Sequence, residues 1–254
     1  MLALEGVTKR FGGLTAVRGV DLRVERGDLV GVIGPNGAGK TTLFNLIAGF
    51  QRPDAGHVRL DGVDLAGQEP HTICRRGLTR TFQIVKPFGN LSVEDNVMIG
   101  ALTRVASVRR ARREAAAVLE ACGLGPFRAT RARALPIGLR KRLEVARALA
   151  TGPRLLLLDE VLAGLNPAEL GPMLDLIRRL HAEGLTLLVI EHIPRPARHR
   201  RLPGRGVCAC SGLTRWTPST GISRPWPASP SRSANERSSR WSAPTPPASP
   251  RRSV

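Results

Sequence analysis

The sequence predicts an α/β fold with a parallel sheet, and three features of the chain lead to this prediction. Short apolar segments, typical of buried strands, alternate with amphipathic segments, typical of helices. A glycine-rich segment from Gly34 to Thr42 joins one apolar strand to the start of a helix. Two later apolar segments end in residues that can carry chemistry, Asp159 with Glu160 and then His192. Strands and helices that alternate around a glycine loop favour a parallel sheet covered by helices.

The elements follow in a regular order. We expect strands at residues 2–8, 16–24, 29–33, 57–60, 155–158 and 185–190. We expect helices at residues 42–48, 105–121, 139–150 and 170–182. The first helix ends before Gly49, and the second is strongly basic. A chain of 254 residues with this pattern is long enough to bury a large core.

Bulk composition favours a cytoplasmic protein. No apolar run reaches the roughly 18 residues of a transmembrane helix. The N-terminus starts with a strand-like pattern, so we expect no secretory leader. Cys74, Cys122, Cys208 and Cys210 do not have the spacing of a zinc site, which favours a reducing compartment.

The charge divides the chain into two unequal parts. The formal net charge is +19, but residues 193–254 hold 12 arginines and one acid, a net of +11 in the last 62 residues. This tail also holds 11 of the 20 prolines and shows no strand or helix period. We therefore expect a folded domain at 1–192 and a disordered or frame-shifted tail at 193–254. Binding of the tail to nucleic acid or anionic lipid stays open as an alternative, although we expect no specific nucleic acid partner.

The glycine-rich segment fits a phosphate-binding loop. The pattern is Gly34, four residues, Gly39, Lys40 and Thr41. Glycines let the backbone turn so that several N–H groups point into one concavity, and the following helix N-terminus adds to the attraction for an anion. Lys40 would place a positive charge near the β- and γ-phosphates, and Thr41 would offer a hydroxyl to Mg²⁺. The loop residues expected to bind the cofactor are Gly34, Pro35, Asn36, Gly37, Ala38, Gly39, Lys40, Thr41 and Thr42.

Other polar residues complete a candidate site. Asp159 would orient Mg²⁺, and Glu160 would polarise the water that attacks the γ-phosphate. His192, 32 residues after Glu160, would hydrogen-bond the γ-phosphate. Gln83 offers a neutral amide oxygen that can act as a weak ligand for Mg²⁺ or water. The candidate catalytic residues are therefore Lys40, Glu160 and His192, and the candidate metal ligands are Thr41, Gln83 and Asp159.

Together these residues resemble the ATP-binding subunit of an ATP-binding cassette (ABC) transporter, and residues 1 to about 193 match that family in order. Within the family, the subunits of bacterial branched-chain amino acid importers are the most similar. Three segments carry the resemblance: Lys9 to Val17, Gly34 to Gly49 and Gly77 to Gln83. The resemblance implies an ABC-type ATPase domain of the P-loop NTPase fold, with a helical subdomain at about 85–150. It implies an ATPase coupled to transport, with ATP and Mg²⁺ as cofactors.

The resemblance also implies roles and partners. Phe11 matches the aromatic residue that stacks on adenine, Gln83 the glutamine lid and His192 the switch histidine. Leu165 and Asn166 lie where the dimer-contact loop falls. The implied partners are a second ABC ATPase subunit, in a heterodimer, the transmembrane permease subunits and, indirectly, a substrate-binding protein. The subunit would be peripheral, on the cytoplasmic side of the bacterial inner membrane.

Two departures from the family pattern stand out. The signature segment usually reads Leu-Ser-Gly-Gly-Gln, but here it runs from Leu135 through Pro136 and Ile137 to Gly138 and Leu139. Pro136 has no hydroxyl and no N–H to donate to a phosphate of the partner subunit. The second departure is the tail, where the strands and the final helix of the family are not recognisable.

Three alternatives remain open at the level of the sequence. The chain could serve an importer of urea or amides, because such transporters use similar subunits. It could be a soluble cassette ATPase that acts on ribosomes or nucleic acid. It could also be a frame-disrupted, inactive product.

Overall fold

A computed structural model describes residues 1–82, 87–191 and 205–208. Contacts group Met1–Trp216 into one compact unit, and the description below concerns that unit. The remaining unit, Thr217–Val254, lies outside the described residues.

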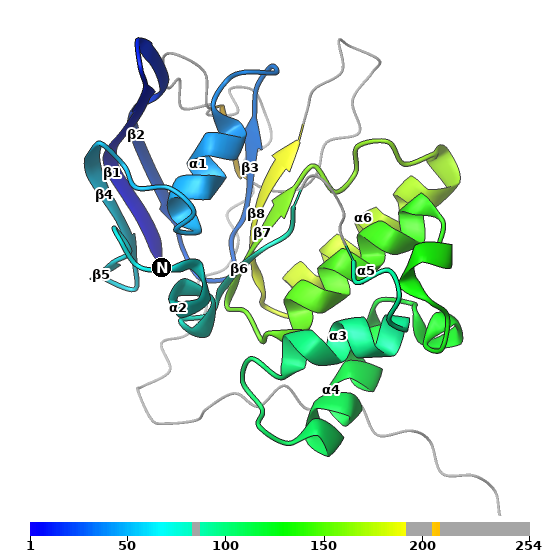
Figure 1. Cartoon of the computed structure of the whole chain (residues 1–254). Helices are drawn as coiled ribbons and strands as arrows, with labels where there is room; N and C mark the ends of the chain where they lie inside the picture. The colour runs from blue at the N-terminus through cyan, green and yellow to red at the C-terminus, as the bar shows by residue number, and fades with distance from the viewer. Residues whose placement is uncertain (83–86, 192–204, 209–254) are drawn as a thin grey trace, which may run out of the picture. The chain divides into compact units, whose positions relative to one another are not determined.

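The described strands form two sheets (Figure 1). An antiparallel sheet has the order β2-β1-β4-β5, and a parallel sheet has the order β6-β7-β8-β3-β9. The antiparallel strands are β1 (Leu2–Phe11), β2 (Leu14–Val24), β4 (Ala55–Leu60) and β5 (Val63–Asp64). The parallel strands are β3 (Leu29–Ile33), β6 (Leu78–Arg80), β7 (Leu155–Asp159), β8 (Thr186–Glu191) and β9 (Arg205–Cys208).

The helices are α1 (Lys40–Ile47), α2 (Pro70–Arg75), α3 (Val93–Ala101), α4 (Val108–Ala121), α5 (Ile137–Ala150) and α6 (Pro167–Ala182), with 3-10 turns at Gly125–Phe127 and Ala132–Ala134. Each of the four expected helices is present, with ends shifted by no more than three residues. The sequence prediction missed α2 and α3. Within the range expected for a helical subdomain, α3 packs against both α4 and α5.

The expectation of a parallel sheet holds for β3, β6, β7, β8 and β9, but not for β1, β2, β4 and β5. β1 and β2 are joined by the two-residue turn Gly12-Gly13, and so short a connection can only reverse the chain into an antiparallel hairpin. β4 then pairs antiparallel with β1, and β5 with β4, so these four strands form a separate sheet that the sequence analysis did not anticipate.

The expectation of a tail without regular structure does not hold for Arg205–Cys208. These residues pair in parallel with β3, from Val30↔Arg205 to Ile33↔Cys208. Without β9, that edge of β3 would present unpaired N–H and C=O groups. A proline-free extended segment can satisfy these groups whatever its side chains are. The other residues of the tail, 193–204 and 209–254, lie outside the described residues.

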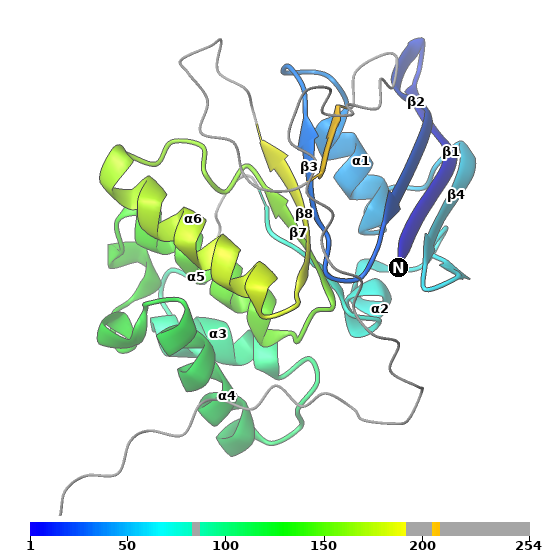
Figure 2. The same cartoon turned by 180° about the vertical axis from the view of Figure 1, so that it is seen from behind.

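Two apolar cores cover the two faces of the parallel sheet. In β7, Leu155 and Leu157 belong to the core shared with α1 and the antiparallel sheet, whereas Leu156 and Leu158 belong to the core shared with α3, α4, α5 and α6. Figure 2 shows α1 on one side of β3, β8 and β7 and the pair α5 and α6 on the other. Because side chains alternate along a strand, a fully apolar strand such as β7 must be buried on both faces.

The packing makes a quantitative prediction. Replacing the fully buried Leu157 by alanine is expected to lower the free energy of unfolding by about 2–5 kcal/mol, because apolar contacts are lost and a cavity remains. Urea unfolding measures the change. The matched control is Leu14→Ala at a side chain that is 68% exposed, where a change within about 0.5 kcal/mol is expected. Equal effects of the two substitutions would contradict the described core.

Candidate functional site

The glycine loop lies between β3 and α1, as the sequence predicts. Gly39 is the residue before α1 and has a left-handed backbone with φ of 81°. A Cβ atom at Gly39 would lie 2.1 Å from the carbonyl oxygen of Ala16 on β2. Glycine is therefore required at this position, both for the backbone angle and for the close approach of another strand.

Lys40 is the first residue of α1, and its side chain turns back over the loop. The residue is only 4% exposed, and Nζ donates hydrogen bonds to the carbonyl oxygens of Gly34 (2.6 Å) and Pro35 (2.8 Å). Thr41 is exposed, and Thr42 is partly buried, in the same first turn. No acidic residue occupies that turn. The helix start thus keeps the positive character that attracts an anion.

Asp159 ends β7, and its carboxylate is almost fully buried. One carboxylate oxygen, Oδ2, accepts a hydrogen bond from Arg80 at 2.6 Å. The other, Oδ1, is buried with no hydrogen-bond partner among the described residues. Burial raises the pKa of the Asp159 carboxyl group, and the Arg80 guanidinium opposes that shift. An orphaned carboxylate oxygen beside a phosphate loop fits a ligand of Mg²⁺, directly or through water.

Arg80 is the residue of this site that the sequence analysis did not assign. Its guanidinium also donates to Asn45 Oδ1 on α1, and its Cζ lies 5.7 Å from the Phe44 ring centroid and 5.3 Å from that of Phe82. Arg80 thereby joins β6, β7 and α1. The three-residue strand Leu78-Thr79-Arg80 gave no clear periodic signal in the sequence, and only the fold shows that the buried guanidinium has a carboxylate partner.

Glu160 follows Asp159 in a left-handed backbone conformation, with φ of 50°. Its N–H donates to the carbonyl oxygen of Ile190 on β8 at 3.0 Å, and the residue is 7% exposed. A positive φ is uncommon for a residue with a Cβ and persists only where the surroundings hold it.

The parallel sheet brings these groups to one edge. β3 and β7 both pair with β8, and all three strands run in the same direction. Their carboxyl ends deliver the glycine loop from β3 and Asp159 with Glu160 from β7 (Figure 1). Ligands of open parallel sheets bind at this edge.

Two predicted site residues, Gln83 and His192, lie outside the described residues. Their neighbours in sequence are described. Phe82 N–H donates to Glu144 Oε1 on α5, and Glu191 ends β8.

Phe11 ends β1, where its side chain is 45% exposed. The Nζ of Lys9 lies 5.7 Å from its ring centroid. An exposed ring of this kind is available to stack on a planar ligand.

The signature segment begins α5, with Pro136 at the position before the helix and Leu135 buried. The N–H of Gly138 donates to Glu169 Oε1 at 3.2 Å. Glu169 also forms a capping box with Asn166 at the start of α6. Leu165, the other predicted dimer-contact residue, packs at the edge of the core next to α6. The departure at Pro136 is therefore accompanied by a carboxylate that accepts from the N–H of Gly138, in the first turn of α5.

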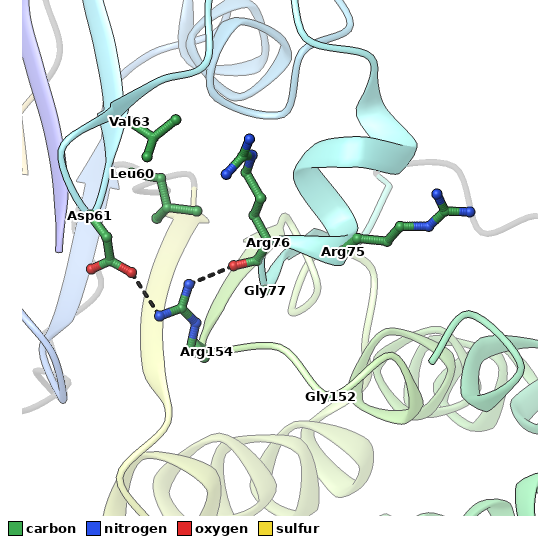
Figure 3. Close-up of a pocket in the computed structure, with 8 residues that line it drawn as sticks. All are labelled: Leu60, Asp61, Val63, Arg75, Arg76, Gly77, Gly152 and Arg154. Carbon is green, nitrogen blue, oxygen red and sulfur yellow. Dashed lines mark hydrogen bonds and ion pairs between the residues drawn. The ribbon is translucent and has the colours of Figure 1, made fainter. Parts of the chain in front are cut away.

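A cavity of about 490 Å³ lies away from this site, lined by Leu60, Asp61, Val63, Arg75, Arg76, Gly77, Gly152 and Arg154 (Figure 3). Its central group is Arg154, which donates to Arg76 O at 2.7 Å and lies 2.7 Å from Asp61 Oδ2. Gly77 and Arg154 precede β6 and β7, so the cavity lies at the opposite ends of these strands from Asp159. We interpret the Arg154 contacts as a structural tie between the β4–β5 turn and the α2–β6 turn.

Among the described residues there is no group of three or more His, Cys, Asp or Glu side chains arranged to hold a metal ion. No helix within the described ranges is both long and apolar enough to span a membrane.

Comparison with known proteins gives one family. The family model for "ABC transporter" matches residues 17–163. The chain is 43% identical over 208 residues to the high-affinity branched-chain amino acid transport ATP-binding protein BraF of Pseudomonas aeruginosa, covering 76% of this chain and 82% of that protein. It is 39% identical over 208 residues to LivG of Escherichia coli, which has the same description, with the same coverage of both chains.

Solved structures give the same result. The chain is similar to a nucleotide-free ATP-binding cassette from an ABC transporter, with a TM-score of 0.69, 33% identity and coverage of 76% of this chain and 81% of that chain. It is similar to the ADP conformation of the cassette MJ1267 with the same TM-score and identity, covering 76% and 82%. The covered 76% corresponds to about 193 of the 254 residues.

The loop geometry predicts a specific defect. Gly39→Ala is expected to abolish binding of a fluorescent nucleotide, because a Cβ cannot fit 2.1 Å from the Ala16 carbonyl oxygen. Gly62→Ala is the matched control: Gly62 has the same φ of 81°, but no atom lies within 4 Å of the added Cβ. The control should lose only about 1 kcal/mol of stability and keep its affinity. Equal loss of affinity in both variants would count against the described loop.

Proposed function

The chain belongs to the ABC transporter family, and on this premise we propose that it binds MgATP and hydrolyses ATP to drive import through a membrane transporter. The observation that carries the proposal is the convergence at one sheet edge of the glycine loop with Lys40 and the two acids Asp159 and Glu160. The loop after β3 would bind the polyphosphate, and the two buried acids at the end of β7 lie one strand away, across β8. Together they form the two halves of a site for phosphoryl transfer.

The phosphate half of the site rests on the start of α1. The backbone N–H groups of the loop and the helix N-terminus would receive the β- and γ-phosphates. Lys40 would exchange its bonds to the Gly34 and Pro35 carbonyls for bonds to phosphate oxygens, so its charge is already positioned before the ligand arrives. Phe11 would stack on the adenine ring.

The metal half of the site rests on Asp159. Thr41 and Asp159 would hold Mg²⁺, with Gln83 as a further ligand, and such an ion would supply positive charge to the phosphates. The buried Oδ1 of Asp159 supports this role, because it has no hydrogen-bond partner within the described part of the chain. Arg80 would keep Oδ2 oriented and so leave Oδ1 available as a ligand.

Hydrolysis would depend on Glu160 and His192. Glu160 would polarise the attacking water, and His192 would hold the γ-phosphate from the end of β8. The pairing of β7 with β8 supports this arrangement, since it aligns the ends of the two strands next to each other.

The proposed cargo is a branched-chain amino acid, supported by the descriptions of BraF and LivG. The chain would sit on the cytoplasmic face of the membrane, with permease subunits and a second ATPase subunit as partners, and a substrate-binding protein would act only indirectly. Four exposed apolar side chains, two before and two after Gln83 in the sequence, support contact with a permease. These are Phe50, Phe82, Phe88 and Leu91, of which Phe50 and Phe82 pack edge to face with centroids 5.6 Å apart.

Replacing the proposed base separates binding from chemistry. Glu160→Gln is expected to lower ATP turnover by about 100-fold or more, because an amide cannot polarise water, while the affinity for ATP stays within a few-fold. Phosphate release and titration with a fluorescent nucleotide measure the two effects. Glu120→Gln, at an exposed site on α4, is the matched control and should keep the wild-type rate. Failure of the unchanged chain to bind MgATP would instead favour a frame-disrupted product.

The signature segment predicts an asymmetric pair of ATP sites. A homodimer of this chain is expected to hydrolyse ATP at least 10-fold more slowly than a heterodimer with a partner that has an intact signature, because Pro136 cannot donate to the γ-phosphate bound by the other subunit. Steady-state ATPase rates of the two assemblies, purified separately, test this. Equal full rates would refute the proposed asymmetry.

A further inference from the structure

Lys141 is a buried cation on α5 whose bonds go to backbone rather than to a carboxylate. The residue is 7% exposed. Its Nζ donates to the carbonyl oxygen of Glu160 at 2.9 Å and also to that of Ala163. Burying an ammonium group costs free energy unless its N–H donors are satisfied. The two carbonyl oxygens therefore hold the Lys141 side chain in place, and the side chain in turn holds the two carbonyl groups.

The two carbonyls belong to one turn, residues 160–163, which follows β7. Within it, the N–H of Ala163 donates to the carbonyl oxygen of Glu160 at 3.2 Å. The turn starts at the left-handed backbone of Glu160, with φ of 50°, which is unfavourable for a residue with a Cβ. An external contact must therefore stabilise the turn, and the two bonds from Lys141 provide one.

A second side chain holds the opposite side of the turn. Glu191, the last residue of β8, accepts a hydrogen bond from the N–H of Leu162 through Oε1 at 3.0 Å. The turn is thus held between Lys141, which donates to its carbonyls, and Glu191, which accepts from its N–H. Lys141 lies on α5, which begins at the signature segment. Glu191 ends β8, and His192 is the next residue in the sequence.

The charges around Lys141 are consistent with this arrangement. Three acids from three elements act on its ammonium group: Glu191 on β8, Glu144 on α5 and Glu160 after β7. Burial lowers the pKa of Lys141, and the three carboxylates oppose that shift. Burial also raises the pKa of Glu144 and that of Glu191 to about 7, so the two hydrogen bonds to the carbonyl oxygens, rather than a full ion pair, hold the ammonium group.

We infer that Lys141 is a positioning residue for Glu160: its ammonium group holds the 160–163 turn so that the Glu160 side chain faces the bound phosphates. The inference rests on the role proposed for Glu160 as the base that polarises water. It goes beyond that role, because the position of Glu160 would then depend on α5, the helix that starts at the signature segment. A displacement of about 1 Å in a reacting group can cost on the order of 100-fold in rate.

The test compares Lys141→Met in the full chain with the matched control Arg142→Met, which removes the neighbouring cation of α5. Lys141→Met is expected to lower kcat for ATP by about 10- to 100-fold with KM within 3-fold, whereas Arg142→Met keeps both. Lys141→Arg retains a cation with several donors and is expected to recover part of kcat. Wild-type kcat in Lys141→Met, or loss of kcat and affinity together in a folded protein, would overturn the inference.

A second readout does not depend on turnover. Amide hydrogen exchange at Leu162 and Ala163 is expected to accelerate at least 10-fold in Lys141→Met, with unchanged exchange in β3 and β7. Unchanged exchange at these two amides would overturn the inference even if activity falls. If the unchanged chain binds MgATP without hydrolysing it, the proposed function fails, and the exchange result still decides whether Lys141 holds the turn.

Should Lys141→Met fail to fold, Lys141→Gln decides the question. Its neutral amide is shorter and can reach only one of the two carbonyls, so an intermediate loss of kcat at constant KM is expected. Wild-type turnover in a folded Lys141→Gln protein would refute the positioning role.

Discussion

The buried ion pair between Arg80 and Asp159 is the contact on which the rest of the site depends. Both side chains are nearly inaccessible, and their atoms lie 2.6 Å apart. An isolated charge at either position would be strongly unfavourable, so each group fixes the other. Because Arg80 also reaches Asn45 on α1, the pair sets the spacing between the helix that follows the glycine loop and the strand that carries the acids.

The same principle recurs at two other buried cations. Lys40 donates to carbonyls of its own loop, and Lys141 donates to carbonyls of the turn after Glu160. In each case a buried ammonium group is held by backbone carbonyl oxygens. Charges placed in advance need little reorganisation when the ligand binds, which is the main electrostatic advantage of a preformed site.

Sequence reasoning located the parts of this site that depend on local pattern. The loop from Gly34 to Thr42 was predictable because the spacing of Gly39 and Lys40 follows from the chemistry of one short segment. The placement of Asp159 after a buried strand was predictable for the same reason. Arg80 and Lys141 were not assigned, because their partners lie 79 and 19 residues away and only the folded chain brings them together. The antiparallel sheet was missed because the β1–β2 pairing follows from a two-residue turn and the β1–β4 pairing joins segments far apart in the sequence, and periodicity reveals neither.

The effect of Pro136 in the signature segment depends on the residues that contact the start of α5. Pro136 removes a donor, and this alone would weaken any contact with a phosphate bound by a partner. Glu169 adds a second effect, since its carboxylate accepts from the N–H of Gly138 and also caps α6 through Asn166. A phosphate that approached this helix start would meet a negative charge where an N–H is needed. Repair of Pro136 alone would leave that carboxylate in place, so a functional contact requires Glu169 to move away or a partner that supplies the missing donors.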